Sequence, residues 1–472
     1  MEEQNDEIRE ISVHKDQIMS EQIEDFTTCE FPIETPWGEV NIDLLSFEKA
    51  KKRAKKIANP PGPNEMGRLV QEFLGGEEHV DTMYWGPKLG GLIKFYTDEH
   101  FSNYELVEEF NYVKGMKLEP TYGQIQLGKN NTQKFVQSGW RFYQNDNFRF
   151  VIQFSVDQYD NDERISIMTT EFSKGLFMID ELEAGFYQSG PLKGRFFDMS
   201  FNILERDGRI NDLIAWNHDI QEQLNKDVIQ FLSIIPELKA RGLPNSRGII
   251  LSGPPGTGKT MMAKSLANQA QISTMLISAE MIHAKNQVKK AFEVARKLSP
   301  TLMIIEDIDT AGTVSRRFTD HPILGEYLQA MDGMEPNDGI VIVATTNHTE
   351  NIDPAISDRP GRFDRIIEIP LPGVNQRKKV LLNYLQKLDC EEGIEETIAK
   401  VARSTDGLSG AWVREIAQTA LIEAMYNGRE KIAKEHLISA LKDVLNRRGM
   451  AYQPTTTLSA KISQKNAEPY TM

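Results

Sequence analysis

Eight residues with the types and spacing of a phosphate-binding loop lie near the middle of the chain. They are Gly253, Pro254, Pro255, Gly256, Thr257, Gly258, Lys259 and Thr260. An apolar run at 248–251 precedes them and a helix-forming stretch at 261–270 follows, which is the strand–loop–helix setting that this motif requires. Glycines let backbone N–H groups surround phosphates, while Lys259 reaches their oxygens and the Thr260 hydroxyl ligates Mg²⁺. The loop therefore predicts binding of a nucleoside triphosphate with Mg²⁺.

Hydrolysis of a triphosphate also needs a carboxylate near the metal, a base for the attacking water, a sensor of the γ-phosphate and a cation. Candidates for each follow the loop in the chain. Glu306 and Asp307 come directly after one apolar run, and Asn347 lies shortly after another. Arg359 and Arg362 lie further on, in a turn that follows a helical stretch. We take these five side chains as the candidate catalytic set.

Short apolar runs separated by helical stretches must position these residues, from about residue 216 to 374. The expected strands are 248–251, 275–278, 302–305, 340–345 and 366–369. Strands that are apolar on both sides are typical of a parallel sheet covered by helices on both faces. We therefore expect an α/β domain at 216–374 with a five-stranded parallel sheet. Residues 375–448 show helical periodicity only and predict a small helical lid.

Residues 31–215 have a different composition, rich in aromatic residues and in strand-like alternation. Phe150, Ile152 and Phe154 alternate with polar residues, and a turn at 159–162 leads to a second apolar alternation near residue 165. A period of two predicts half-buried strands. We expect an α+β N-terminal domain without a chemical motif, flanked by an acidic tail at 1–30 and followed, at the far end of the chain, by a polar tail at 449–472.

A basic segment at 47–57 ends at prolines and predicts a short helix. It is either a docking surface for an acidic partner or nucleic acid, or a solvated helix face that balances the acidic tail. Charge runs are more often solvated faces, which favours the second interpretation.

Charge and cysteine usage restrict the remaining function classes. The chain of 472 residues has a formal net charge of −15, which disfavours sequence-independent attraction to nucleic acid or anionic lipid. Its two cysteines, Cys29 and Cys390, lie far apart, as expected in a reducing compartment. No apolar run approaches the length of a membrane span. We expect a cytoplasmic protein without a membrane segment.

From about residue 216 to 448, roughly half of the chain, the sequence resembles the AAA group of ring ATPases, which includes FtsH-like proteases and proteasomal ATPases. The resemblance rests on the phosphate-binding loop and on the candidate catalytic set, in this order. It extends to Met-Asp-Gly-Met at 331–334, which is similar to the family's intersubunit signalling turn. It extends also to 407–411, which is similar to the start of the lid helix that approaches the nucleotide.

This resemblance implies an AAA+ module that assembles as a homo-oligomer, a hexameric ring with ATP at the subunit interfaces. Arg359 and Arg362 then reach the γ-phosphate of the neighbouring subunit, and Gly410 and Ala411 lie at the nucleotide. An arginine supplied in this way is worth roughly 10³–10⁵ in rate. The chain before the loop, at 238–248, is also similar to bacterial AAA proteins and to the mitochondrial AAA chaperone that translocates the Rieske protein.

The order Glu306-Asp307 departs from the usual Asp-Glu order of the family, although the Rieske-translocating subgroup tends to share it. By this resemblance Glu306 occupies the position that holds Mg²⁺ together with Thr260. Asp307 becomes the base, Asn347 orients water and senses the γ-phosphate, and Lys259 binds phosphate. Because aspartate is one methylene shorter than glutamate, we expect hydrolysis to survive at a reduced rate.

Relatives that thread polypeptide carry an aromatic–apolar–Gly tripeptide after the second strand, and the interval 278–288 here has neither an aromatic residue nor a glycine. Processive threading is therefore not expected. The favoured interpretation is an ATPase that remodels or translocates a protein client bound through its N-terminal domain. Two alternatives stay open: an ATP-gated ring scaffold or sensor that activates an effector protein, and a nucleic-acid motor.

Overall fold

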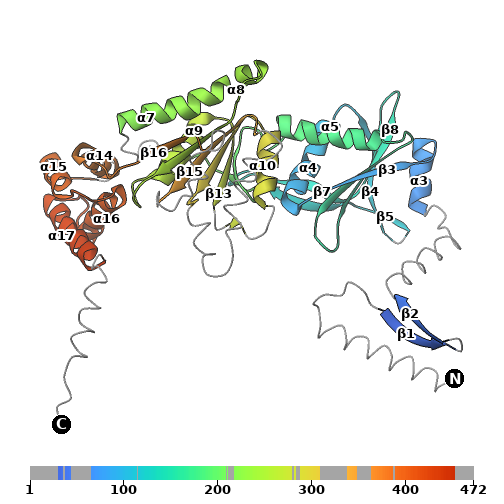
Figure 1. Cartoon of the computed structure of the whole chain (residues 1–472), viewed down its shortest axis with the longest axis horizontal. Coiled ribbons are helices and arrows are strands. Elements are labelled where there is room, and N and C mark those ends of the chain that lie inside the picture. The colour runs from blue at the N-terminus through green and yellow to red at the C-terminus, as the bar shows by residue number, and fades with distance from the viewer. Residues whose placement is uncertain are drawn as a thin grey trace, which may run out of the picture. The chain divides into compact units, whose positions relative to one another are not determined.

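The computed structural model describes residues 30–35, 38–43, 65–113, 115–208, 210, 217–278, 281–282, 287–308, 337–347, 363–385 and 389–451, with residues 30–43 and 450–451 as backbone only. The chain divides into two compact units, Met1–Glu77 and Glu78–Met472 (Figure 1). The first unit contains an antiparallel hairpin of β1 (Glu30–Thr35) and β2 (Gly38–Asp43), and helix α3 (Glu65–Leu74). The predicted basic helix at 47–57 lies outside the described residues. None of the helices described is both long and apolar enough to cross a membrane.

The second unit begins with the predicted α+β domain. Its elements are β3 (His79–Trp85), α4 (Pro87–His100), β4 (Glu105–Val113), β5 (Met116–Leu118), β6 (Thr121–Gln126), β7 (Thr132–Gln144), β8 (Arg149–Val156), β9 (Glu163–Thr169) and α5 (Lys174–Ser189). The strands pair antiparallel in the order β3-β9-β8-β7-β4-β5, and β6 pairs with β7. Helices α4 and α5 pack together with the face of the sheet that carries Phe150, Ile152 and Phe154, all of them buried as the alternation predicts.

A buried ion pair lies inside this N-terminal domain. Lys94 of α4 and Glu163 of β9 form a salt bridge in which the lysine side chain is fully buried. The Lys94 ammonium also donates to the carbonyl oxygens of Gln137 and Ser155, both at 2.8 Å. Burial lowers the pKa of Lys94, and the hydrogen bond to Glu163 opposes that shift. Every donor direction of this ammonium therefore has an oxygen acceptor.

The ATP-binding module follows with a mostly parallel sheet. Its elements are β10 (Phe196–Asp198), β11 (Ile203–Leu204), α7 (His218–Leu224), the π-helical turn η1 (Asn225–Gln230), α8 (Phe231–Ala240), β12 (Arg247–Ser252), α9 (Lys259–Ala270), β13 (Ser273–Ser278), α10 (Gln287–Lys297), β14 (Thr301–Glu306), β15 (Ile340–Thr346) and β16 (Arg365–Glu368). The strand order is β11-β10-β13-β14-β15-β12-β16. All five predicted strands are present.

Alternate residues of these strands belong to two different cores, one on each face of the sheet. Ile249 and Leu251 pack with α8 and α9, whereas Ile250 packs in the cluster that includes α10. That second cluster continues into the core of the N-terminal domain. Both faces of the sheet are thus covered, as the apolar strands predict.

Two strands extend the sheet beyond the five expected from the sequence. β10 pairs parallel with β13, and β11 pairs antiparallel with β10. Lys193, just before β10, donates to the carbonyl oxygens of Leu298 and Ser299 at 2.9 and 3.1 Å. The domain boundary near 215 stays a prediction, but the ATP-binding sheet already begins at Phe196.

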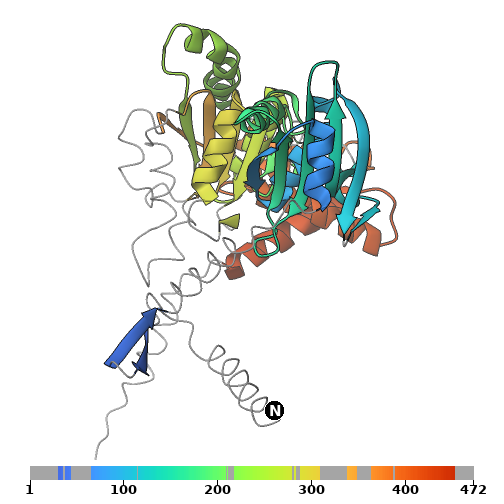
Figure 2. The same cartoon turned by 90° about the vertical axis from the view of Figure 1, so that its right-hand side faces the viewer.

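Four helices follow the sheet: α14 (Val374–Leu385), α15 (Glu395–Ser404), α16 (Gly410–Tyr426) and α17 (Lys434–Ala451). They are coloured orange to red in Figures 1 and 2 and share a hydrophobic core of their own. Val413, Ile416, Ala417 and Ala420, the stripe expected on one helix face, are all buried in that core.

Candidate nucleotide-binding site

The phosphate-binding loop connects β12 to α9, so it lies at the carboxyl end of a central strand. Gly253, Gly256 and Gly258 have φ values of 143°, 76° and 97°, in the region that only glycine adopts readily. A Cβ atom at Gly256 would lie 2.7 Å from Ser409 Oγ and 3.0 Å from Ala411 Cβ. Glycine at this position therefore serves both the turn and the close approach of the lid helix.

Lys259 begins α9, and its ammonium is held inside the loop. The side chain is buried, and Nζ donates to the carbonyl oxygens of Gly253 at 2.7 Å and Pro254 at 2.9 Å. It also donates to Asn347 Oδ1 at 2.7 Å. The lysine that the sequence assigns to phosphate thus lies beside the predicted sensor on β15.

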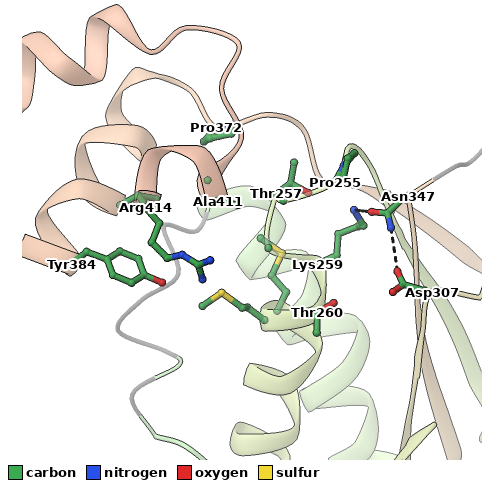
Figure 3. Close-up of a pocket in the computed structure, with 16 residues that line it drawn as sticks. Pro255, Thr257, Lys259, Thr260, Asp307, Asn347, Pro372, Tyr384, Ala411 and Arg414 are labelled. Atoms are coloured by element: carbon green, nitrogen blue, oxygen red, sulfur yellow. Dashed lines mark hydrogen bonds between the residues drawn. The ribbon is translucent and has the colours of Figure 1, made fainter. Parts of the chain in front are cut away.

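Asn347 and Asp307 form the next link. Asn347 Nδ2 donates to Asp307 Oδ1 at 3.1 Å, as Figure 3 shows. With its oxygen on a lysine and its nitrogen on a carboxylate, the orientation of the amide is determined. Asp307 has φ 50° and donates its backbone N–H to Thr345 Oγ1 at 3.0 Å. Because β14, β15 and β12 are parallel neighbours, their carboxyl ends bring these three side chains together.

A pocket of about 320 Å³ contains this chain of hydrogen bonds and extends toward the lid. The residues that line it are Pro255, Gly256, Thr257, Gly258, Lys259, Thr260, Met261, Met262, Asp307, Asn347, Pro372, Val380, Tyr384, Gly410, Ala411 and Arg414. The lid docks directly on the loop, because Ala411 N–H donates to the carbonyl oxygen of Gly256 at 3.0 Å. Gly410 and Ala411 therefore lie where the resemblance places them.

Tyr384 and Arg414 are pocket residues that sequence reasoning did not assign to the site. Tyr384 belongs to the apolar stripe of α14, and Arg414 lies one turn inside α16. Both extend from the lid into the part of the pocket away from Asp307 (Figure 3). Helical periodicity marks such residues as one face of a helix, and it does not indicate which neighbouring element that face meets.

The remaining members of the catalytic set are placed differently. Glu306 does not line the pocket, and its Oε1 atom lies 3.1 Å from Lys264 Nζ. Arg359, Arg362 and the turn at 331–334 lie outside the described residues. The roles predicted for Glu306 and the two arginines stay predictions.

The residues around the loop fit Mg²⁺. This cation takes oxygen ligands, commonly one or two from the protein together with phosphate oxygens and water. Thr260 contributes a hydroxyl at the start of α9, and Asp307 contributes a carboxylate on the same pocket. Mg²⁺ bound here with a nucleotide would neutralise charge on the β- and γ-phosphates.

A strand, a glycine-rich loop and a helix whose lysine faces an amide and a carboxylate from two neighbouring parallel strands define a P-loop nucleoside triphosphatase domain. Residues 249–371 match the model of the ATPase family associated with various cellular activities, abbreviated AAA. The chain therefore contains an ATPase domain of the AAA family.

Curated relatives of this domain come from archaea and plants. A proteasome-activating nucleotidase of Sulfurisphaera tokodaii is 34% identical over 260 residues, 52% of this chain and 65% of that protein. One of Saccharolobus solfataricus is 32% identical over 241 residues, 48% of this chain and 60% of that protein. The ATP-dependent zinc metalloprotease FTSH 11 of Arabidopsis thaliana is 33% identical over 227 residues, 46% of this chain and 28% of that protein. The chain thus spans less than two thirds of these relatives.

Replacing Tyr384 with alanine is expected to weaken ATP binding. With the phosphates at the loop, the base extends toward the lid, and stacking of a base on an aromatic ring is worth about 1–3 kcal/mol, roughly 5- to 150-fold in Kd. Titration of a fluorescent ATP analogue measures this change. Tyr384→Phe should bind normally, and Tyr426→Ala, on the exposed end of α16, is the matched control. Equal affinity of Tyr384→Ala and wild type would contradict a stacking role.

Proposed function

We propose that this chain hydrolyses ATP with Mg²⁺ in an oligomeric ring and uses the cycle to remodel or translocate a protein partner. The observation that carries the hydrolysis is the hydrogen-bonded series Lys259–Asn347–Asp307 beside the phosphate-binding loop. It gathers a cation for phosphate, an oriented amide and a carboxylate on one pocket.

Each side chain in this series has a role that follows from its surroundings. Lys259 moves from loop carbonyl oxygens and Asn347 to phosphate oxygens, which are stronger acceptors because they are charged. Asn347 orients the water that attacks the γ-phosphate, and Asp307 accepts the proton of that water. The Thr260 hydroxyl holds Mg²⁺ at the β- and γ-phosphates.

The ring is proposed from the family resemblance and from the names of the relatives, two of which are proteasome-activating nucleotidases. In such a ring Arg359 and Arg362 would act on the nucleotide of the neighbouring subunit. The direct contact between the lid and the phosphate-binding loop supports coupling of nucleotide state to lid position, since a ligand that enters between them changes that contact.

A protein partner, rather than nucleic acid or a membrane, is proposed to bind the N-terminal domain. The formal net charge of −15 disfavours nucleic acid. The relatives' names refer to proteasome activation and to proteolysis, both of which concern proteins. A cytoplasmic location is proposed from the sequence alone.

The first experiment compares the full-length chain with Lys259→Ala in three assays. These are phosphate release with and without Mg²⁺, molecular mass by light scattering with and without ATP, and capture of proteins from source-cell lysate by the slowly hydrolysing Asp307→Asn variant. Mg²⁺-dependent phosphate release, lost in Lys259→Ala, together with a protein captured only in the ATP state, is the expected result.

Other results identify the alternatives. ATP-dependent assembly without measurable turnover would favour the ATP-gated scaffold or sensor. Turnover stimulated by DNA or RNA, with binding that weakens steeply as salt rises, would favour the nucleic-acid motor. A wild-type chain that does not bind ATP at all would refute the proposed function.

A further inference from the structure

The order Glu306-Asp307 places two carboxylates at the end of one strand, and the strand geometry separates them. Residues 302, 304 and 306 of β14 lie on the same face, because side chains alternate along a strand. Leu302 and Ile304 belong to the core that β14 shares with α9. Glu306 therefore extends toward α9, while Asp307 lies on the pocket and accepts the hydrogen bond from Asn347.

Lys264 of α9 meets Glu306 on that face. The Glu306 carboxylate is largely buried, with 16% of its side chain exposed, and Oε1 lies 3.1 Å from Lys264 Nζ without the geometry of a hydrogen bond. The Lys264 side chain is 32% exposed, so it reaches this carboxylate from the rim of the domain. A largely buried carboxylate needs such a counter-charge.

The position of Lys264 on its helix determines where the carboxylate is held. Thr260 and Lys264 are four residues apart and share a face of α9. Lys264 thus lies about one turn, roughly 5.4 Å, further along the helix than the threonine whose hydroxyl would ligate Mg²⁺. Paired with Lys264, the Glu306 carboxylate is drawn away from Thr260 and toward the middle of α9.

We propose that Lys264 is a positioning residue that holds Glu306 out of the metal shell, so that Asp307 is the carboxylate presented to Mg²⁺ and nucleotide. This inference rests on the proposed function, since it concerns the same site. It assigns Glu306 to the packing of α9 rather than to the metal. The charge of Lys264 sets the Mg²⁺ concentration at which ATP binds.

Lys264→Met removes the counter-charge and keeps the length of the side chain. The released Glu306 carboxylate then turns toward Thr260 and joins the metal shell. Changes in the partners of metal ligands alter metal affinity by about 10- to 100-fold, and we expect the half-saturating Mg²⁺ concentration to fall about 10-fold. The readout is binding of N-methylanthraniloyl-ATP to the full-length chain during a MgCl₂ titration, which requires no turnover.

Three further variants make the test specific. Lys264→Met/Glu306→Gln should return the Mg²⁺ midpoint to the wild-type value, because no carboxylate is left to release. Lys264→Arg should behave as wild type. Lys289→Met, which removes an exposed lysine from a comparable pair with Glu293 on α10, should leave the midpoint unchanged.

The outcomes separate this inference from the function on which it rests. A midpoint that falls in Lys264→Met and recovers in the double variant supports it. A midpoint that is unchanged or raised in a folded Lys264→Met chain overturns it, while wild-type binding of the nucleotide leaves the proposed function in place. If Lys264→Met does not fold, a raised midpoint in Glu306→Gln alone overturns it, because that variant then shows Glu306 to be a ligand. Absence of nucleotide binding by the wild type overturns both.

Discussion

Asp307→Asn is expected to bind ATP about as tightly as the wild-type chain and to hydrolyse it roughly 10²–10⁴ times more slowly. The substitution removes the group that accepts a proton from water and retains the size of the side chain. Asparagine also tolerates the left-handed backbone at φ 50° better than most residues, so the local fold should persist. Its amide can still bond with Asn347.

Single-turnover phosphate release and equilibrium binding of an ATP analogue measure the two halves of this prediction. Asp219→Asn, an exposed aspartate on α7, is the matched control and should change neither quantity. Asp307→Glu is the informative companion, because the longer acid restores reach but must adopt a left-handed backbone that costs about 1–2 kcal/mol. Undiminished turnover in Asp307→Asn would move the role of base to another residue.

Lys94→Met is expected to lower the free energy of unfolding of the N-terminal domain by about 3–5 kcal/mol, because it leaves the Glu163 carboxylate buried without its partner. The loss extends beyond one ion pair, since the two backbone carbonyl oxygens that accept from Lys94 also lose a donor. Hydrogen exchange of peptides from α4 and β9, measured in the full-length chain, follows this domain separately from the ATPase.

Two comparisons qualify the result. Lys88→Met, an exposed lysine near the start of the same helix, should leave exchange unchanged. Lys94→Met/Glu163→Leu should recover much of the protection, because replacing both buried charges by apolar groups removes the unpaired carboxylate. Equal exchange in Lys94→Met and wild type would show that the pair contributes little to stability.

The parts of the fold that sequence reasoning predicted depend on local pattern. The five strands near the nucleotide are apolar on both faces, and the loop between β12 and α9 has its own motif, so each can be identified within about ten residues. The same holds for β8, where alternation at 150, 152 and 154 matches the buried face. The lid stripe at 413–420 follows from helical periodicity.

The parts that were missed depend on contacts between distant residues. The three residues of β10 are too few to show a period, and their partner strand lies more than 70 residues later. Lys94 and Glu163 are 69 residues apart, and nothing in either neighbourhood indicates the other. In the site, the resemblance assigns Glu306 to the metal, whereas its direction depends on the strand face and on Lys264.

The left-handed backbone at Asp307 gives a physical reason for part of the unusual carboxylate order. Non-glycine residues with positive φ are mostly Asn, Asp and His, and glutamate is not among those enriched there. A glutamate at 307 would need a different backbone at the end of β14. The order Glu-Asp is thus consistent with the turn that this strand makes.

The pairing of β10 with β13 determines where this chain can be divided for biochemical work. A fragment that starts at the expected boundary near residue 216 lacks the strand that pairs with residues 274–276. It would expose the apolar edge of β13, and unpaired strand edges promote aggregation. A fragment that begins before Lys193 keeps both added strands and the bonds to the loop before β14. An insoluble shorter fragment would therefore report a missing strand and would say nothing about whether the ATPase needs its N-terminal domain.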